Sequence, residues 1–445
     1  MFFYIRASLL FAASALALPN PSHNSPTYDV CSEAKEHHPT ALPTSCFSTT
    51  KSHSTSIPVL SPFPWNATST KTPLPTSSTS TVTLNSSAST SASASVQTAP
   101  YGSPVAPKVL LIANAFEFSY LKGYNFTTRY TGPLFDHVFA CTSNGETCML
   151  ACGQELVSAA QITALVLIPG IDLTQTYIFI TGTGGVNPKY GTAGGVAISK
   201  YSVQWEWGGM FLGADLPANF SGQYFFSYAQ DAPNKYPSLV GSEVYELNAA
   251  LVDRFYNLTS SLAFQDVTPS LQTLRATYQY ASARRAPFLS MCDVVSAQVY
   301  WHGAVAGENV EYYTNVVTSG AAKPCNTNED DQGRLLALVG AAVHKKLDFG
   351  RVVLIKTFSN FDRPPPQLTA FQSRYNVGEG ATEPGLLNAW SVIKLAAKDI
   401  TTHWAGVYGR GIPAPNYIGD AKGSLGGIPE FRRNSSAVAG SVQGA

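Results

Sequence analysis

One short apolar run, followed at once by polar residues and prolines, constrains this chain most. Residues 352–355 are all apolar, and three of the four are β-branched. This is typical of a strand buried on both faces of a parallel sheet. Ser359, Asn360, Asp362 and Arg363 then bring polar groups together, and three consecutive prolines prevent a regular element directly after them. Polar groups just beyond the carboxyl end of a buried strand lie where open α/β sheets bind small ligands.

These polar residues fit two interpretations. An asparagine amide carries a donor and an acceptor, so Asn360 can donate to a purine ring nitrogen while it accepts from a neighbouring exocyclic group. Asp362 can do the same only when it is protonated. In the second interpretation, Ser359 and Asn360 form an Asx-type turn, and Asp362 pairs with the adjacent Arg363. The stretch by itself does not decide between a binding site and a turn.

The start of the chain has the features of a signal peptide. Arg6 precedes an apolar run at residues 9–18, and Ala15-Leu16-Ala17 gives the small-x-small pattern of a cleavage site. We expect a signal peptide over residues 1–17, a disordered stalk rich in Ser, Thr and Pro over residues 18–106, and a flexible tail over residues 433–445. Asn-x-Ser/Thr sequons agree with a secreted glycoprotein outside the cell, in the cell wall or at the cell surface.

Seven cysteines in an oxidising compartment should mostly pair and leave one over. Cys141 and Cys148 are close enough for a small disulfide loop, and Cys31 with Cys46 can close another. Metal binding is not expected, because Cys148 and Cys152 have no second pair or His-x3-5-His nearby. The zero formal net charge argues against partners bound through bulk charge, such as nucleic acid. No transmembrane span of its own is expected after the leader.

Order is expected to begin at residue 108, where strands and helices start to alternate. Val109–Ala113 and residues 177–181 read as further short buried strands, and Glu117 places a carboxylate just after the first of them. This alternation predicts an α/β domain over residues 107–432, with a mixed, largely parallel sheet flanked by helices.

A glycine cluster, Gly182-Thr-Gly-Gly-Val-Asn187, follows the strand expected at residues 177–181. It is not the dinucleotide fingerprint, because Asn187-Pro188 interrupts where the helix should start, and it is not a phosphate-binding Walker loop. Two interpretations stay open. The cluster is either a loop whose backbone approaches a ligand closely or a plain tight turn.

Several other candidates have structural alternatives. Tyr300 can stack on a base or belong to the core, and His302 can donate a proton or be structural. Glu329 and Asp330 precede a helix expected over residues 333–346, whose N-terminus they would stabilise. The chain has no Gly-x-Ser-x-Gly elbow, His-Glu-x-x-His motif or kinase signature. A glycosidase-type carboxylate pair stays open, since spacing in sequence does not give spacing in space.

Residues 108–420 taken together resemble the fungal purine nucleoside permease family, whose sequences are similar to the nucleoside phosphorylase and nucleosidase fold. Six blocks in the right order carry this resemblance: Ala115-Phe-Glu117, Phe179-Ile-Thr-Gly-Thr-Gly-Gly-Val-Asn-Pro188, Gly241-Ser-Glu-Val-Tyr-Glu-Leu-Asn248, Cys325-Asn-Thr-Asn-Glu-Asp330, Ser359-Asn-Phe-Asp-Arg-Pro-Pro-Pro366 and Asn416-Tyr-Ile-Gly-Asp420.

The resemblance implies a nucleoside phosphorylase-like domain that binds purine nucleosides. The glycine cluster would lie beside the pentose, Glu329 would hold ribose hydroxyls, Glu117 would position water or a nucleophile, and the corner at residues 359–362 would meet the purine. Breaking an N-glycosidic bond builds positive charge on the ribose and electron density on the base, so these groups suit the transition state. The resemblance thus assigns catalysis to Asn360, Asp362 and Glu117, and substrate binding to Glu329, Asp330, Gly182, Thr183, Gly184, Tyr300, Ser359 and Phe361.

Three positions depart from the family pattern. The corner usually reads Ser-Asp-Phe-Asp, whereas this chain has Asn360, and an amide can hydrogen-bond the base but cannot deliver a proton to it. Asn328 replaces a common glutamine, and Ser119 stands where a second acid is usual.

Three hypotheses follow. The first is an extracellular enzyme that cleaves purine nucleosides, by hydrolysis rather than phosphorolysis, because no Arg or Lys cluster is committed to phosphate. Phosphate is then the one candidate co-substrate, and no other cofactor is implied. The second is a non-catalytic nucleoside-binding component of transport that works with a membrane transporter partner. The third is a wall glycoprotein with a decayed site. Oligomeric state, including an oligomer, is left open.

Overall fold

The computed structural model describes residues 97–130, 138–205, 215, 236–237, 239–376 and 380–433. The expected signal peptide, the stalk up to residue 96, Cys31, Cys46 and the tail beyond residue 433 lie outside these ranges. In chain order the strands are β1 (Gln97–Ala99), β2 (Val109–Ala113), β3 (Phe126–Tyr130), β4 (Val138–Thr142), β5 (Thr147–Ala151), β6 (Tyr177–Val186), β7 (Val196–Ser199), β8 (Tyr201–Gln204), β9 (Val244–Glu246), β10 (Leu289–Met291), β11 (Asp293–Ser296), β12 (Pro324–Asn328), β13 (Val352–Phe361) and β14 (Gly419–Asp420). The helices are α1 (Ala115–Phe118), α2 (Glu155–Leu167), α3 (Ala249–Thr259), α4 (Pro269–Arg275), α5 (Ala281–Arg284), α6 (Ala304–Val317), α7 (Asp331–Val343), α8 (Ala370–Asn376), α9 (Thr382–Thr402) and α10 (Glu430–Arg433).

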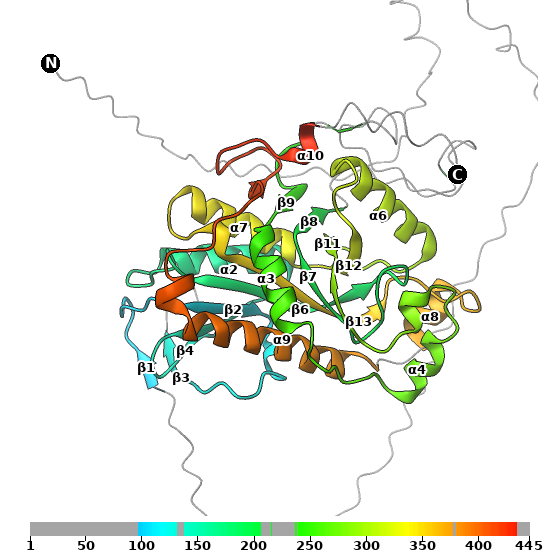
Figure 1. The fold of residues 1–445 in the computed structure, drawn as a ribbon, viewed down its shortest axis with the longest axis horizontal. Coiled ribbons are helices and arrows are strands. Elements are labelled where there is room, and N and C mark those ends of the chain that lie inside the picture. The colour runs from blue at the N-terminus through cyan, green and yellow to red at the C-terminus, as the bar shows by residue number, and fades with distance from the viewer. Residues whose placement is uncertain are drawn as a thin grey trace, which may run out of the picture. The chain divides into compact units, whose positions relative to one another are not determined.

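A mixed sheet forms the centre of the domain, as predicted (Figure 1). Its middle is parallel, because β2 lies between β5 and β6 and runs parallel to both, and β13 runs parallel to β6 on the other side. Antiparallel pairs, such as β12 with β6 and β13 with β7, make the rest of the sheet mixed. The strand predicted at residues 109–113 is confirmed as β2.

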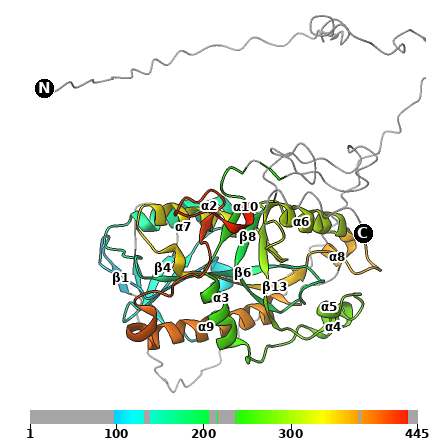
Figure 2. The ribbon, with the colours of Figure 1, turned by 45° about the horizontal axis from the view of Figure 1, so that its top comes forward.

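Helices cover both faces of the central strands because side chains alternate along each strand. Leu110, Ile178 and Leu354 face a core shared with α2 and α7, whereas the neighbouring Leu111 and Phe179 face a core shared with α3 and α9. Figure 2 shows α2 and α7 on one side of the strands and α3 and α9 on the other. The predicted α/β class with flanking helices is confirmed. Within the described ranges, no helix is both long and apolar enough to cross a bilayer.

Two strands extend further than the sequence indicates. β6 continues to Val186, so the glycine cluster is part of a strand, and its interpretation as a loop or tight turn is wrong. The physical reason is close packing: a Cβ at Gly184 would lie 2.3 Å from the carbonyl oxygen of Thr327 on β12. β13 likewise continues to Phe361, so Asn360 lies within the strand, beside a register shift that follows Phe358.

Two disulfides link described cysteines. Cys141–Cys148, the predicted small loop, joins β4 to β5, and Cys292–Cys325 ties the residue before β11 to β12. The second pairing was not predicted, because the two residues are 33 positions apart and only the fold brings them together. Cys152 is buried and is the free cysteine of the described residues.

Replacing both Cys292 and Cys325 by serine is expected to lower the free energy of unfolding by about 3–4 kcal/mol, because the disulfide restricts a long loop in the unfolded chain. Urea unfolding of the purified protein measures this change. The Cys141–Cys148 disulfide spans only 7 residues. The Cys141→Ser/Cys148→Ser variant should therefore lose about 1 kcal/mol less of the free energy of unfolding than the Cys292→Ser/Cys325→Ser variant. A larger effect at the short loop would contradict the prediction.

Candidate functional site

Two adjoining cavities lie at the carboxyl ends of β6 and β13. The polar pocket, about 110 Å³, includes Asn114, Glu117, Gly185 and Asp330 in its wall. The wide pocket, about 440 Å³, is walled by residues of α4 and α8, together with His302 and Phe361. The two pockets share six lining residues: Gln154, Thr183, Tyr300, Glu329, Ser359 and Asn360. They therefore form one cleft with a polar part and a wider part.

Glu117 is a buried carboxylate in the wall of the polar pocket, and two backbone N–H groups donate to it and fix its position. Asn114 caps α1 and donates from its N–H to Oε2 of Glu117 at 3.1 Å, while the Glu117 N–H donates to Oδ1 of Asn114 at 2.9 Å. On the other side, the Thr183 N–H donates to Oε1 at 2.6 Å. This reciprocal capping explains why a helix of four residues forms here.

Burial raises the pKa of Glu117, and the nearby charges of Lys356 and Arg334 partly oppose this rise. The side chain is only 1% exposed. A carboxylate that is held in place at a pocket wall and has a raised pKa has the properties of a general base, because its pKa is closer to neutral pH than the pKa of an ordinary glutamate.

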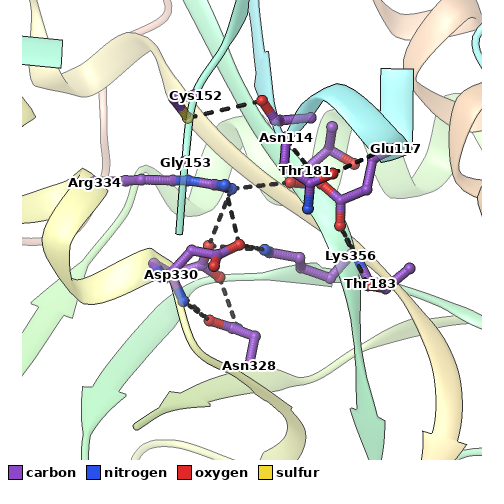
Figure 3. Close-up of polar contacts among 12 residues, drawn as sticks. Asn114, Glu117, Cys152, Gly153, Thr181, Thr183, Asn328, Asp330, Arg334 and Lys356 are labelled. Carbon is purple, nitrogen blue, oxygen red and sulfur yellow. Dashed lines mark hydrogen bonds and ion pairs between the residues drawn. The ribbon is translucent and has the colours of Figure 1, made fainter. Parts of the chain in front are cut away.

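A buried ionic cluster lies behind Glu117 (Figure 3). Lys356 Nζ is 2.9 Å from Asp331 Oδ1 and 3.5 Å from Asp330 Oδ2. Arg334 Nη2 is 3.0 Å from the same Asp330 oxygen, and its Nη1 donates to the Thr181 carbonyl at 3.1 Å. With all groups ionised, these two acids and Glu117 face two cations, so the cluster carries an excess negative charge.

The sequence reasoning missed both cations of this cluster. Lys356 is fully buried in β13, within a strand that is otherwise apolar up to Phe358 except for Thr357. A lysine in such a run is a usable signal, because lysine is almost never fully buried unless it is paired. Arg334 is likewise fully buried on α7. The helix expected at residues 333–346 is observed as α7, and Asp331 in its first turn pairs with Lys356 in addition to any effect on the helix dipole.

Asn360 lies where the two pockets meet, and its neighbours orient its amide. Ser359 Oγ donates to Asn360 Oδ1 at 3.0 Å and also reaches the Gly184 carbonyl at 3.2 Å. Asn360 Nδ2 donates to the Phe361 carbonyl at 2.9 Å and to the Tyr300 hydroxyl at 3.4 Å. The structure thus brings together the predicted residues Thr183, Gly184, Tyr300, Glu329, Asp330, Ser359, Asn360 and Glu117 around the polar pocket.

Asp362, predicted as a catalytic residue, lies outside both pockets. It is buried, and its two carboxylate oxygens accept from Arg363 Nε at 2.7 Å and Nη2 at 2.9 Å. Arg363 also pairs with Glu311 at 2.8 Å. The pairing interpretation therefore describes Asp362, whereas the Asx-turn interpretation does not describe Asn360, which lies in β13.

Gly182, predicted as a substrate-binding residue, supports Glu117 instead of lining a pocket. Its φ is +144°, and a Cβ on it would lie 2.4 Å from Glu117 Oε1. Gly182→Ala is expected to push the carboxylate away from Thr183 and to lower the free energy of unfolding by about 1–3 kcal/mol. Urea unfolding measures the loss. Gly340→Ala is the control, since a Cβ there meets nothing within 4 Å. Equal stability of the two variants would contradict this account.

The wide pocket combines aromatic, apolar and two basic side chains. Tyr278 packs against Phe361 with ring centroids 4.3 Å apart, and Leu271 and Leu274 extend the apolar wall. The guanidinium of Arg374 lies 4.5 Å from the ring centre of Tyr300. Such a wall fits a flat, partly apolar ring. Among the described residues, no group of three or more His, Cys, Asp or Glu side chains is arranged to hold a metal ion.

Comparison with known proteins gives one consistent family. Residues 106–413 match the family model described as purine nucleoside permease. The chain is 32% identical to a purine nucleoside permease of Candida albicans, over 76% of this chain and 86% of that protein. It is 27% identical to a probable purine nucleoside permease of Schizosaccharomyces pombe, over 67% of this chain and 90% of that protein. A solved 5'-methylthioadenosine/S-adenosylhomocysteine nucleosidase of Helicobacter pylori aligns with a TM-score of 0.41 at 13% identity, over 67% of this chain and 99% of that chain.

Proposed function

Because this chain belongs to the purine nucleoside permease family, we propose that it binds purine nucleosides in the two pockets and cleaves their N-glycosidic bond by hydrolysis outside the cell. The observation that carries the proposal is the position of Glu117. This buried carboxylate with a raised pKa shares the wall of one small polar pocket with the carboxylate of Glu329 and the amide of Asn360. Few binding sites need a fixed base of this kind, whereas hydrolysis does.

The ribose would occupy the polar pocket and the base the wide pocket. Glu329 lines both pockets at their junction, where it can accept hydrogen bonds from sugar hydroxyls. The flat apolar wall formed by Phe361 and Tyr278 suits a purine ring. Asn360 lies at the junction, so its amide can hydrogen-bond the ring as the glycosidic bond weakens.

In the reaction, a water oxygen attacks the anomeric carbon while the bond to the base breaks. The electron pair of the broken bond leaves with the base nitrogen. Glu117 takes the proton released by the water, and the base takes a proton from solvent. Positive charge on the ribose is stabilised by the neighbouring carboxylates, and the Asn360 donor stabilises electron density on the base. The excess negative charge of the cluster around Lys356 favours the same ribose charge.

Hydrolysis is favoured over phosphorolysis by the charges of the walls. Of the described residues that line the two pockets, only Arg374 carries a permanent positive charge. Lys356 and Arg334 are nearby, but both are committed to Asp330 and Asp331. A phosphate co-substrate would therefore find one cation, beside Tyr300 in the wide pocket.

The location is part of the proposal. We place the leader at residues 1–17, the stalk after it and the domain at residues 107–432, with the addition that β1, at residues 97–99 within the expected stalk, already pairs with β3 of the sheet. Two disulfides in the described part agree with an oxidising compartment outside the cytosol.

A second candidate is a nucleoside-binding component that delivers its ligand to a membrane transporter. It is favoured by Asn360, because an amide cannot deliver the proton that a departing base requires. In this case the two pockets would bind nucleoside with the same contacts and without turnover.

One experiment separates these functions. The purified full-length protein is incubated with inosine, adenosine and guanosine, with and without phosphate, and free base is measured by chromatography. We expect base to appear without phosphate. Release only with phosphate would make the protein a phosphorylase, and nucleoside binding by calorimetry without release would favour the transport component. If the protein neither binds nucleosides nor releases base, the proposed site is refuted.

A further inference from the structure

Thr327 places a hydroxyl in the wall of the polar pocket, and the function proposed above gives this hydroxyl no role. Thr327 lies on β12, directly opposite Gly185 of β6, and it lines the polar pocket but not the wide pocket. Its Oγ1 makes no hydrogen bond within the described part of the chain, and it is not closed to solvent. A polar group of a pocket wall that no protein group occupies is available to a ligand.

Gly185 has no side chain that could cover this hydroxyl. A Cβ on Gly185 would lie 2.6 Å from Thr327 Oγ1 and 3.2 Å from Asn360 Nδ2. The Thr327 hydroxyl and the Asn360 amide therefore face the same small space in front of the Gly185 backbone. A ligand that contacts this backbone comes within reach of both groups.

The sheet holds the Thr327 hydroxyl in place. β12 pairs with β6 on one side and with β11 on the other, where Val295 lies opposite Thr327. Threonine is branched at Cβ, so its χ1 angle takes few values. The hydroxyl therefore loses little freedom when it binds a ligand, which is the property that preorganised contacts share.

The polar pocket is the part of the cleft proposed to hold the ribose, so Thr327 is expected to meet a sugar hydroxyl. Glu329 lines the same pocket, but an ionised carboxylate only accepts hydrogen bonds and cannot donate to the oxygens of the ribose. The Thr327 hydroxyl can donate. Because it faces the same space as Asn360, which is assigned to the base, its partner should be the hydroxyl closest to the base. That is the 2'-hydroxyl, whose carbon is bonded to the anomeric carbon.

We propose that Thr327 is a specificity-determining residue that donates a hydrogen bond to the ribose 2'-hydroxyl and so favours ribonucleosides over 2'-deoxyribonucleosides. This inference rests on the proposed function, because it needs a nucleoside in the cleft with its ribose in the polar pocket. One neutral hydrogen bond corresponds to about a three- to tenfold difference in Kd. The protein should therefore bind inosine more tightly than 2'-deoxyinosine by at least this factor.

The test compares full-length wild type and Thr327→Val with inosine, 2'-deoxyinosine and 3'-deoxyinosine. Valine keeps the shape of threonine and removes only the hydroxyl. The readout is Kd from calorimetry, together with kcat/KM from base release where the ligand is cleaved. In Thr327→Val, inosine and 3'-deoxyinosine should each bind about three- to tenfold more weakly, whereas 2'-deoxyinosine should bind as it does to the wild type. Thr327→Ser should keep the preference. Thr163→Val, which removes an exposed hydroxyl on α2, is the control and should change nothing.

Each other outcome overturns the inference. If inosine binds but Thr327→Val leaves its Kd unchanged, Thr327 does not contact the sugar, and the proposed function stands. An equal loss for all three ligands would show that Thr327 only shapes the pocket. A loss for 2'-deoxyinosine without one for 3'-deoxyinosine would overturn the assignment to the 2'-hydroxyl. If Thr327→Val does not fold, equal wild-type affinities for inosine and 2'-deoxyinosine would be decisive against the contact. A wild type that neither binds nor cleaves inosine refutes both this inference and the proposed function.

Discussion

Glu117→Gln is expected to lower the rate of nucleoside cleavage by about a thousandfold, because glutamine keeps the shape of the side chain but cannot take a proton from water. Nucleoside binding should change far less, since Glu117 is assigned to the water and not to the ribose or base. The measurement is free base released per unit time, combined with calorimetric binding of the same nucleoside.

The hydrogen bonds of Glu117 define a second consequence of this change. Both oxygens accept from backbone N–H groups, of Asn114 and of Thr183. The NH₂ of a glutamine must face one of these donors, which should lower the free energy of unfolding by about 1–3 kcal/mol. The activity and binding of Glu117→Gln should therefore be measured at a temperature well below the one at which this variant unfolds. Glu146→Gln, in an ion pair with Lys108 away from both pockets, is the matched control and should keep full activity.

The pH profile gives an independent check on this role. A general base acts only when it is deprotonated, so wild-type activity should fall as the pH drops through the pKa of Glu117. Because burial raises this pKa, the fall should begin at a higher pH than an ordinary glutamate would give. The residual activity of Glu117→Gln should lack this acid limb. Retention of the limb, or loss of less than about tenfold in rate, would remove Glu117 from catalysis.

The sequence predicted the strands better than it predicted the pocket residues. A strand is specified by consecutive residues, whereas the pocket depends on residues that are far apart in the sequence. A buried strand such as β2 is specified by five consecutive residues. The end of β6 is not, because Gly182 and Gly184 resemble a loop until β12 and the Glu117 carboxylate are placed against them. The residues next to these glycines in the sequence do not predict these close contacts.

The same distinction explains which site residues were found. Asn360 and Glu329 were predicted because each belongs to a motif that is continuous in sequence, and both line the two pockets. Lys356 and Arg334 were missed because their role depends on Asp330 and Asp331, which only the fold brings near them. Asp362 looked catalytic in sequence, yet its carboxylate turns to the adjacent Arg363. Spacing along a strand predicts which residues alternate, but not which of them reach the pocket.

Lys356→Met should lower the free energy of unfolding by about 3–5 kcal/mol, because it leaves Asp330 and Asp331 buried without their cation on β13. Methionine keeps most of the volume of the lysine stem, so the loss is mainly electrostatic. Lys108→Met removes a lysine from a partly exposed pair with Glu146 and is expected to lose at most about 1 kcal/mol. Urea unfolding of both variants measures the difference.

The double variant Lys356→Met/Asp331→Asn separates charge from packing. If the unpaired carboxylate causes the loss, neutralising Asp331 should recover part of it, and the two changes will not be additive. Activity gives a second readout, because Lys356 lowers the pKa of Glu117 and its removal should move the acid limb of the pH profile upward. Additive losses with an unmoved acid limb would mean that Lys356 only fills space. Recovery with a shifted limb would show that one buried cation both holds the sheet to α7 and sets the proton affinity of the base.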